Sequence, residues 1–180
     1  WLERTQRTHE EMPDDVVANM QLEPDDVVAD VGAGTGYFSF RMAQKVPQGK
    51  VLANDIQPEM LAIMEQRKQE LGVSNVETIL GTTQDPGLPE NSVDKVLLVD
   101  TYHEFSHPFE MIKGVVDAMK PGAKLFLVEY RAEDDTVPIR PLHKMSEEQV
   151  VLEMSVFGLK WDDTLDFLPW QHMFVFSKPE

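Results

Sequence analysis

A short apolar run is followed at once by three glycines at alternate positions. The run, residues 27–31, is rich in β-branched side chains and predicts a strand, and Gly32, Gly34 and Gly36 come directly after it. Residues 37–46 then show a helical pattern that ends before a proline. Glycine lets the backbone turn tightly and lets a ligand approach it closely. A strand, a glycine turn and a helix in this order are typical of the first unit of a parallel α/β sheet.

The same alternation of strands and helices continues along the chain. The central runs are apolar at consecutive positions, which indicates strands covered by helices on both faces. Stretches 158–163 and 171–177 have no helix between them, which predicts an antiparallel closing pair. Further strands are expected at 51–53, 76–80, 94–100 and 124–128, and helices are expected to begin at Pro58, at Pro108 and after Ser146.

Length and charge limit the class of protein. A chain of 180 residues is expected to form one domain over residues 23–180, preceded by a helical appendage or lid over residues 1–22. The 16 basic and 32 acidic residues give a net charge of −16, which argues against nucleic acid and anionic membranes as partners. No cysteine is present, so disulfides and thiolate chemistry are excluded.

Localisation and assembly are less constrained. No apolar run reaches the length of a membrane-spanning helix, so a cytoplasmic location is favoured. An exported form stays open because the chain begins at Trp1 rather than Met. The oligomeric state is not indicated by the sequence.

The spacing around the glycines points to a nucleoside-containing ligand. A dinucleotide fingerprint is GxGxxG, whereas here the third glycine comes one residue early and the bulky Tyr37 follows it. Asp55 ends the second strand, 21 positions beyond Gly34, where a carboxylate can accept hydrogen bonds from both hydroxyls of a ribose. Asp30 ends the first strand, where it meets either a ligand ammonium group or solvent. A tight turn without a ligand is the alternative.

An acidic residue, a GxGxG loop and a second acid at the end of the next strand resemble the class I S-adenosylmethionine-dependent methyltransferases. The resemblance covers about residues 27–176, and PGAKLFLVEY is similar to the family's fifth strand and the turn before it. It implies an α/β, Rossmann-like, doubly wound sheet of seven strands in the order 3-2-1-4-5-7-6, with strand 7 antiparallel. It also implies S-adenosylmethionine as cofactor and methyl transfer as the reaction.

The resemblance further implies a set of cofactor-binding residues. The glycine loop would pass under the methionine moiety, Asp55 would hold the ribose and Ile56 would pack against the adenine. Many relatives carry an acid soon after the third strand, but this chain reads GTTQDPGLP, so Thr82 and Asp85 both stay open as the adenine contact. The full set is Asp30, Gly32, Ala33, Gly34, Gly36, Tyr37, Asp55, Ile56, Thr82, Asp85 and Asp100.

The segment after the fourth strand is the candidate acceptor site. It reads VDTYHEF and lacks the Asn/Asp-Pro-Pro-aromatic motif of methyltransferases that act on nucleobases or glutamine, which favours a small-molecule acceptor. Ligands of open α/β sheets bind outside the carboxyl ends of the strands. Tyr102, His103 and Glu104 are therefore the catalytic candidates: histidine accepts a proton near neutral pH, and glutamate binds a cationic or hydroxylated acceptor. A loop that only caps the next helix is the alternative.

The pentapeptide from His103 to His107 matches the zinc signature HExxH. That site needs both histidines on one helical face, and Pro108 interrupts such a helix. We therefore predict no catalytic zinc in the pentapeptide, and the sequence assigns no metal ligand.

Other segments are expected to contribute walls of the site. Arg131, the basic loop 138–144 and the aromatic segment 167–172 are the candidates. Trp1 to Arg4 resemble a lid segment of a small bacterial group that shares the DTYHEFSHP and LPWQH stretches. A nicotinamide-dependent oxidoreductase and a non-catalytic S-adenosylmethionine-binding module are the alternative functions.

Overall fold

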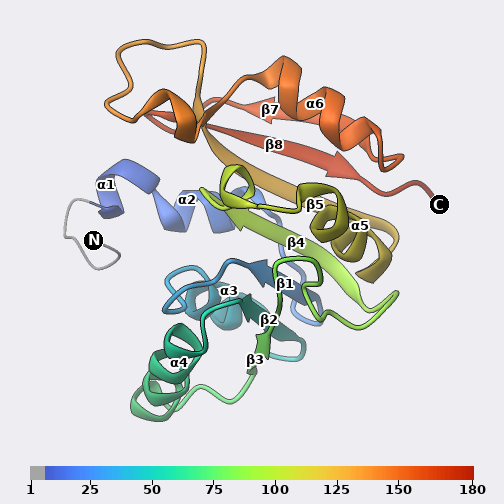
Figure 1. Cartoon of the computed structure of the whole chain (residues 1–180). Coiled ribbons are helices and arrows are strands. Elements are labelled where there is room, and N and C mark those ends of the chain that lie inside the picture. The colour runs from blue at the N-terminus through green and yellow to red at the C-terminus, as the bar shows by residue number, and fades with distance from the viewer. Residues whose placement is uncertain (1–6) are drawn as a thin grey trace.

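The computed structural model describes residues 7–180, with Arg7 described for its backbone only. A single mixed sheet in the order β3-β2-β1-β4-β5-β8-β7 forms its centre, and β6 pairs with β5 beside this path (Figure 1). The strands are β1 (Val27–Val31), β2 (Lys50–Asp55), β3 (Val76–Leu80), β4 (Val93–Val99), β5 (Met119–Arg131), β6 (Lys144–Met145), β7 (Lys160–Leu165) and β8 (Gln171–Ser177).

The strand order confirms the predicted sheet. β8 and β7 take the places of the predicted strands 7 and 6, and β8 pairs antiparallel with both β5 and β7. The sequence missed β6, a two-residue strand that pairs parallel with Tyr130 and Arg131. Two residues are too short to show a periodic pattern, so only the fold identifies this strand.

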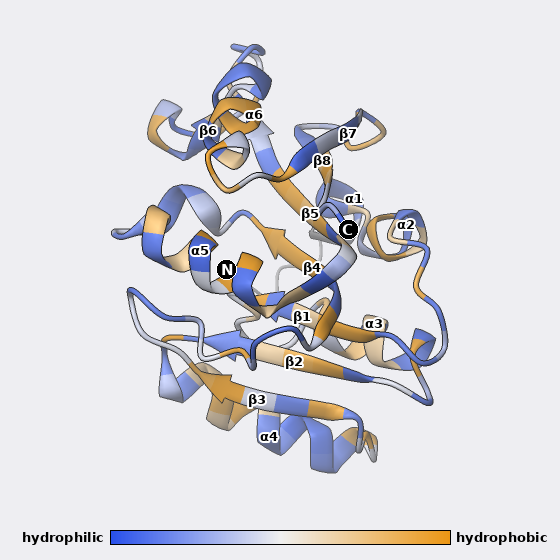
Figure 2. Cartoon of the chain, turned by 90° about the vertical axis from the view of Figure 1, so that its right-hand side faces the viewer, coloured by the Kyte–Doolittle hydropathy of each residue, from blue (hydrophilic) through white to orange (hydrophobic). Residues whose placement is uncertain are grey.

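Helices cover both faces of the sheet, as the continuously apolar strands predicted. One core lies between the sheet and α2, α3 and α4, and a second core lies between the opposite face and α5 and α6. Neighbouring strand residues alternate between them, since Val28 belongs to the first core and Ala29 to the second. Figure 2 shows apolar colouring on the arrowhead half of β4 and both hydrophilic and apolar colouring on α4. The helices are α1 (Arg7–Glu11), α2 (Pro13–Asn19), α3 (Ser39–Lys45), α4 (Pro58–Leu71), α5 (Pro108–Ala118) and α6 (Glu147–Ser155), with 3-10 turns η1 (Tyr102–Glu104) and η2 (Pro141–His143).

The N-terminal segment packs on the first core. Val16, Val17 and Met20 are buried against it, so α2 is anchored by apolar contacts. Trp1 to Arg4, the residues compared with a lid, lie outside the described residues. Within 7–180, no helix combines the length and the apolar composition that crossing a membrane requires.

The parallel strands place the expected functional loops at one edge of the sheet. The glycine loop follows β1, Asp55 ends β2, Thr82 follows β3 and the segment 100–104 follows β4. Because β1, β2, β3 and β4 run parallel, their carboxyl ends meet at this edge.

Candidate functional site

Two cavities meet at the carboxyl edge of the sheet. The first, here called the Asp55 cavity, has a volume of ≈ 270 Å³ and is lined by Asp55, Ile56 and Thr82. The second, the His103 cavity, has a volume of ≈ 480 Å³ and is lined by His103 and Arg140. The wall that the two cavities share consists of Gly32, Gly34, Asp100, Thr101 and Glu104.

The glycine loop forms the centre of the shared wall. The backbone N–H groups of Gly32 and Ala33 both donate to the Asn54 carbonyl oxygen at 2.9 Å, which holds the loop against β2. Gly32 has a φ of +78°, and a Cβ atom there would lie 2.5 Å from Thr101 Oγ1. Only glycine fits this position, and it lines both cavities.

Asp55 is held in a fixed orientation at the edge of its cavity. Its Oδ2 accepts a hydrogen bond from the Gly34 N–H at 2.9 Å, and its Oδ1 accepts one from the Gln57 N–H at 2.8 Å. Each carboxylate oxygen has a further lone pair with which it can accept from a ligand hydroxyl. Ile56, which follows it, is 50% exposed and lines the same cavity, so an apolar surface lies beside the carboxylate.

Of the two residues left open after the third strand, Thr82 lines the Asp55 cavity and Asp85 does not. Asp85 Oδ1 accepts from the Gly87 N–H at 2.8 Å, so the carboxylate closes its own turn. The Asp85 N–H donates to Thr82 Oγ1 at 2.9 Å and fixes that hydroxyl at the cavity edge.

Three other predicted cofactor residues lie away from both cavities. Asp30 is 3% exposed, and its Oδ2 accepts from Ser39 Oγ at 2.5 Å. Gly36 packs toward α3 and α4, where a Cβ atom would lie 2.6 Å from Phe40 Cε2. The Tyr37 ring has the Arg41 guanidinium 4.3 Å from its centroid. These residues shape the turn, whereas Ala33 lines the His103 cavity.

Asp100 has an unusual environment in the shared wall. Its Oδ2 accepts from Gln171 Nε2 at 2.9 Å, but its Oδ1 is inaccessible to solvent and has no hydrogen-bond partner in the described chain. Burial, with the nearby charge of Glu129, raises the pKa of Asp100 to about 8. A positively charged ligand at this wall would lower that pKa, so the environment suits the sulfonium or ammonium group of S-adenosylmethionine.

His103 is held by a buried acid that the sequence analysis did not select. Its Nδ1 lies 2.5 Å from Oε2 of Glu129, a strand residue of β5 with no exposed surface. The ring therefore presents Nε2 to the cavity, 3.3 Å from Glu104 Oε1. Burial by itself lowers the pKa of His103, but the hydrogen bond and the charge of Glu129 outweigh it and raise the pKa. A lone acid inside an apolar strand was the signal available in the sequence.

The structure does not bring Tyr102 to the cavities. Its side chain is buried, and its hydroxyl donates to Glu153 Oε2 of α6 at 2.6 Å. Burial and this neighbouring carboxylate raise the pKa of the phenol. Tyr102 thus fastens the loop to α6, and His103 and Glu104 are the predicted catalytic residues that line the His103 cavity.

The two histidines of the HExxH pattern do not share a helix. His103 lies in the 3-10 turn η1, whereas His107 is the residue before α5 and its Nδ1 lies 3.0 Å from Ser106 Oγ. As predicted from Pro108, no single helix runs from His103 to His107.

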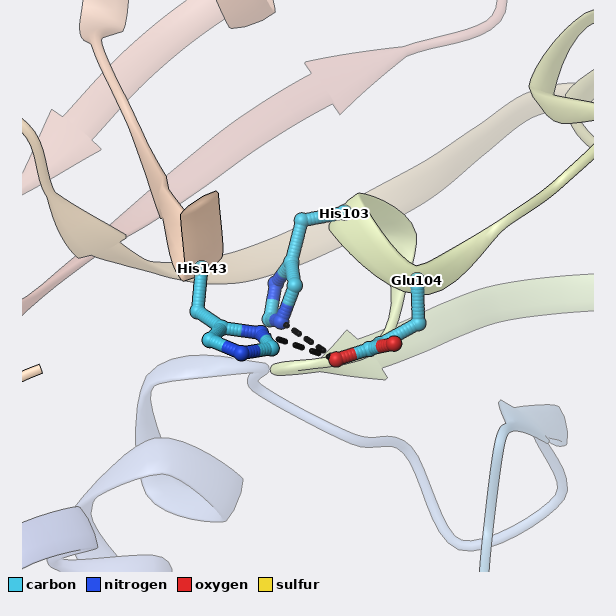
Figure 3. A group of neighbouring side chains, drawn as sticks. All are labelled: His103, Glu104 and His143. Carbon is cyan, nitrogen blue, oxygen red and sulfur yellow. Dashed lines mark ion pairs between the residues drawn. The ribbon is translucent and has the colours of Figure 1, made fainter. Parts of the chain in front are cut away.

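A different histidine faces His103. His143 of η2 has its Nδ1 2.9 Å from Glu104 Oε1, and Figure 3 shows these three side chains pointing toward one another. The basic loop 138–144 thus forms a wall of the His103 cavity, as expected. Arg131 instead donates to the Leu168 carbonyl oxygen at 2.9 Å, and neither it nor segment 167–172 lines either cavity.

The chain is similar in sequence to known methyltransferases. Residues 22–172 match a family model described as a methyltransferase domain. The chain is 30% identical over 145 residues to an uncharacterized methyltransferase-like protein of Schizosaccharomyces pombe, covering 81% of this chain and 50% of that protein. It is 28% identical over 122 residues to a demethylmenaquinone methyltransferase of Oceanobacillus iheyensis, covering 67% of this chain and 51% of that protein. The chain spans about half the length of these curated relatives.

Solved structures share the fold over nearly the whole chain. A crystal structure of an S-adenosylmethionine-dependent methyltransferase from Aquifex aeolicus is 26% identical and covers 98% of this chain and 94% of its own, with a TM-score of 0.90. A geranyl diphosphate methyltransferase in complex with S-adenosylmethionine is 11% identical and covers 98% of this chain and 88% of its own, with a TM-score of 0.78. The chain therefore belongs to the methyltransferase-domain family, whose cofactor is S-adenosylmethionine.

Proposed function

We propose that this chain transfers a methyl group from S-adenosylmethionine to a small-molecule acceptor bound in the His103 cavity. The main observation that supports this proposal is that the two cavities share a wall at Gly32, Gly34 and Asp100. A ligand bound along the glycine loop therefore lies beside the cavity that contains His103 and Glu104.

The residues of the Asp55 cavity are suited to the cofactor. Asp55 would accept from the ribose hydroxyls, and Ile56 and Thr82 would border the adenine. Gly32 and Gly34 line both cavities and have no side chains, so the methionine end would approach the backbone closely there. When bound, S-adenosylmethionine supplies an electrophilic methyl group on a positively charged sulfur.

The residues of the His103 cavity are suited to the acceptor. Glu129 fixes the His103 ring so that Nε2 faces the cavity, where it can accept a proton from an acceptor hydroxyl or ammonium group. Glu104 is 60% exposed at its side chain and can accept a hydrogen bond from the same molecule. Holding acceptor and methyl group in contact supplies much of the rate enhancement in such a displacement.

Two considerations support a small molecule as acceptor. The net charge of −16 opposes nucleic acid and anionic membranes. One relative is named a demethylmenaquinone methyltransferase, and others from Pseudomonas are named ubiquinone/menaquinone biosynthesis C-methyltransferases. A hydroxylated aromatic ring is therefore the first acceptor class to test.

The experiment is product detection by mass spectrometry. The purified chain is incubated with S-adenosylmethionine and a panel of quinols, phenols, amines and thiols, and methylated product is measured together with S-adenosylhomocysteine. Methylation of one class at catalytic turnover supports the proposal. Tight cofactor binding without turnover on any class would favour the non-catalytic binding module. The family match removes the support for a nicotinamide-dependent enzyme.

A further inference from the structure

Three potential metal ligands converge in the His103 cavity. His103, Glu104 and His143 each offer one ligand atom, and these atoms lie within 4.8 Å of one another (Figure 3). They come from two segments about 40 residues apart, η1 after β4 and η2 after β5, which the fold brings together. We propose that these three side chains bind a divalent transition-metal ion of the zinc type, with an open coordination position toward the cavity.

The distances between the ligand atoms fit such a site. Metal–nitrogen and metal–oxygen bonds of about 2.0–2.1 Å in a tetrahedron place neighbouring ligand atoms about 3.3 Å apart. Glu104 Oε1 lies 3.3 Å from His103 Nε2 and 2.9 Å from His143 Nδ1. The remaining pair, the ligand nitrogens of His103 and His143, lies within 4.8 Å, and side-chain rotation would adjust this distance when an ion binds.

The residue behind His103 has the role that a metal-bound histidine requires. The N–H of the other ring nitrogen of such a histidine donates a hydrogen bond to a carboxylate or carbonyl oxygen. This bond fixes the tautomer and the ring orientation. Glu129 Oε2 lies 2.5 Å from His103 Nδ1 and is fully buried, so Nε2 is the free nitrogen. The His103 backbone N–H also donates to Glu129 Oε1 at 3.3 Å, which fixes the residue at two points.

The charge of the cavity also favours a cation. The side chains of Glu104 and Glu11 line it, together with the guanidinium group of Arg140. Glu11 is 4% exposed, so its position at the wall is set by packing. Two imidazoles and a carboxylate form a donor set typical of zinc and iron(II).

This proposal changes the sequence-based expectation that the chain binds no metal. That expectation concerned the His103 and His107 pair, which the structure separates. His143, 40 residues downstream of His103, supplies the second histidine instead. Three protein ligands leave one position for an acceptor oxygen. An ion there would occupy His103 Nε2 and would itself favour deprotonation of the acceptor, in place of proton transfer to that nitrogen. This last step rests on the proposed methyl transfer, whereas metal binding itself does not.

Metal binding can be measured directly on the purified, chelator-treated chain without cofactor. Zn²⁺ titration by calorimetry and Co²⁺ titration by visible absorption are expected to show one equivalent bound in a four-coordinate site. His143→Ala is expected to weaken binding at least 100-fold. Glu129→Gln, which keeps the shape but removes the charge behind His103, is expected to weaken it about 10- to 100-fold.

His107→Ala is the matched control, because it removes a histidine of the same sequence motif that lies outside the cluster. The metal affinity of His107→Ala should stay within twofold of the affinity of the starting chain. Absence of stoichiometric binding, or equal losses in His107→Ala and His143→Ala, would overturn the proposal. Circular dichroism and S-adenosylhomocysteine binding confirm that each variant is folded. A chain that binds the metal but methylates nothing would refute the proposed function alone, and methylation without metal binding would refute this inference alone.

Discussion

His103 Nδ1 and Glu129 Oε2 lie 2.5 Å apart, and this contact joins the loop after β4 to the C-terminal end of β5. Glu129 sits in a row of buried residues between Val128 and Tyr130. A buried carboxylate is costly unless it is paired, and the pair here includes both the ring and the backbone N–H of His103. The orientation of the His103 ring is therefore part of the folded core.

The first prediction concerns the protonation of His103. Because Glu129 raises the pKa of His103 against the opposing effect of burial, Glu129→Gln is expected to lower that pKa. The pKa is measured by NMR titration of the ring protons in metal-free protein. His107, which lies outside the cluster around His103, is the internal control, and the chemical shifts of its ring protons should be unchanged by the substitution. An unchanged pKa for His103 would contradict the assigned contact.

The second prediction separates cofactor binding from turnover. His103→Ala and Glu104→Gln are expected to keep cofactor affinity within a few fold, because Asp55 and the glycine loop remain intact. The two variants should each lower kcat/KM by about 10²-fold or more with a genuine acceptor. Tyr102→Phe is the comparison, since its hydroxyl contacts Glu153 rather than the cavity. Unaltered turnover in His103→Ala would move the acceptor to another wall.

Most of the fold was predictable from the sequence because its signals are local. Continuous apolar strands, prolines that begin helices and the helix-free end each depend on a few neighbouring residues. α4 begins at Pro58 and ends at Leu71 as expected. α3 begins at Ser39, two residues later than expected, because the glycine turn continues through Phe38.

The sequence predicts residues of the candidate site only where they lie together in one segment or at a recognisable spacing. The glycine loop and Asp55 are recognisable from spacing, and they line the Asp55 cavity together. Glu129 contacts His103, 26 positions before it, and His143 contacts Glu104, 39 positions before it. No pattern within one segment of the sequence shows such pairs. Tyr102 looked equivalent to His103 in the sequence, but the 3-10 turn directs it toward α6.

The third prediction tests the ribose contact. Asp55→Ala removes a charge-assisted acceptor, worth about 1.5–3 kcal/mol, and should weaken S-adenosylhomocysteine binding about 10- to 100-fold. Asp85→Ala is the matched control, because its carboxylate closes a turn outside the cavity. Calorimetry on both variants provides the measurement. Equal affinity in Asp55→Ala and the starting chain would remove the ribose assignment.

The fourth prediction is a pH dependence of stability that arises from Asp100. Its pKa in the folded chain, about 8, is above its ordinary value of 3.8, so the folded state binds a proton that the unfolded state releases. This contribution to stability is complete below about pH 4 and is lost as the pH rises through about 8. Asp100→Asn keeps the shape, suits the φ of +50° and has no charge to bury.

The free energy of unfolding of Asp100→Asn is therefore expected to rise relative to the starting chain as the pH increases from 5 to 8.5. Urea denaturation at both pH values measures this difference. Asp117→Asn, a change at an exposed acid, is the control and should show a much smaller trend. A difference for Asp100→Asn that stays constant with pH would show that the carboxyl is already ionised near its ordinary pKa.

The fifth prediction distinguishes two glycines that both have positive φ. Gly36 has a φ of +86°, and a Cβ atom there would lie 2.6 Å from Phe40 Cε2 and 3.2 Å from Met64 Cγ. Gly72, which ends α4, has a φ of +65° and nothing within 4 Å of such an atom. Gly72→Ala should cost only the backbone strain of about 1–2 kcal/mol. Gly36→Ala should cost a further 1–3 kcal/mol, roughly, because it overpacks the core beneath the cofactor loop. Urea denaturation of both variants compares the costs, and equal losses would mean that the turn at Gly36 is looser than its contacts with α3 and α4 indicate.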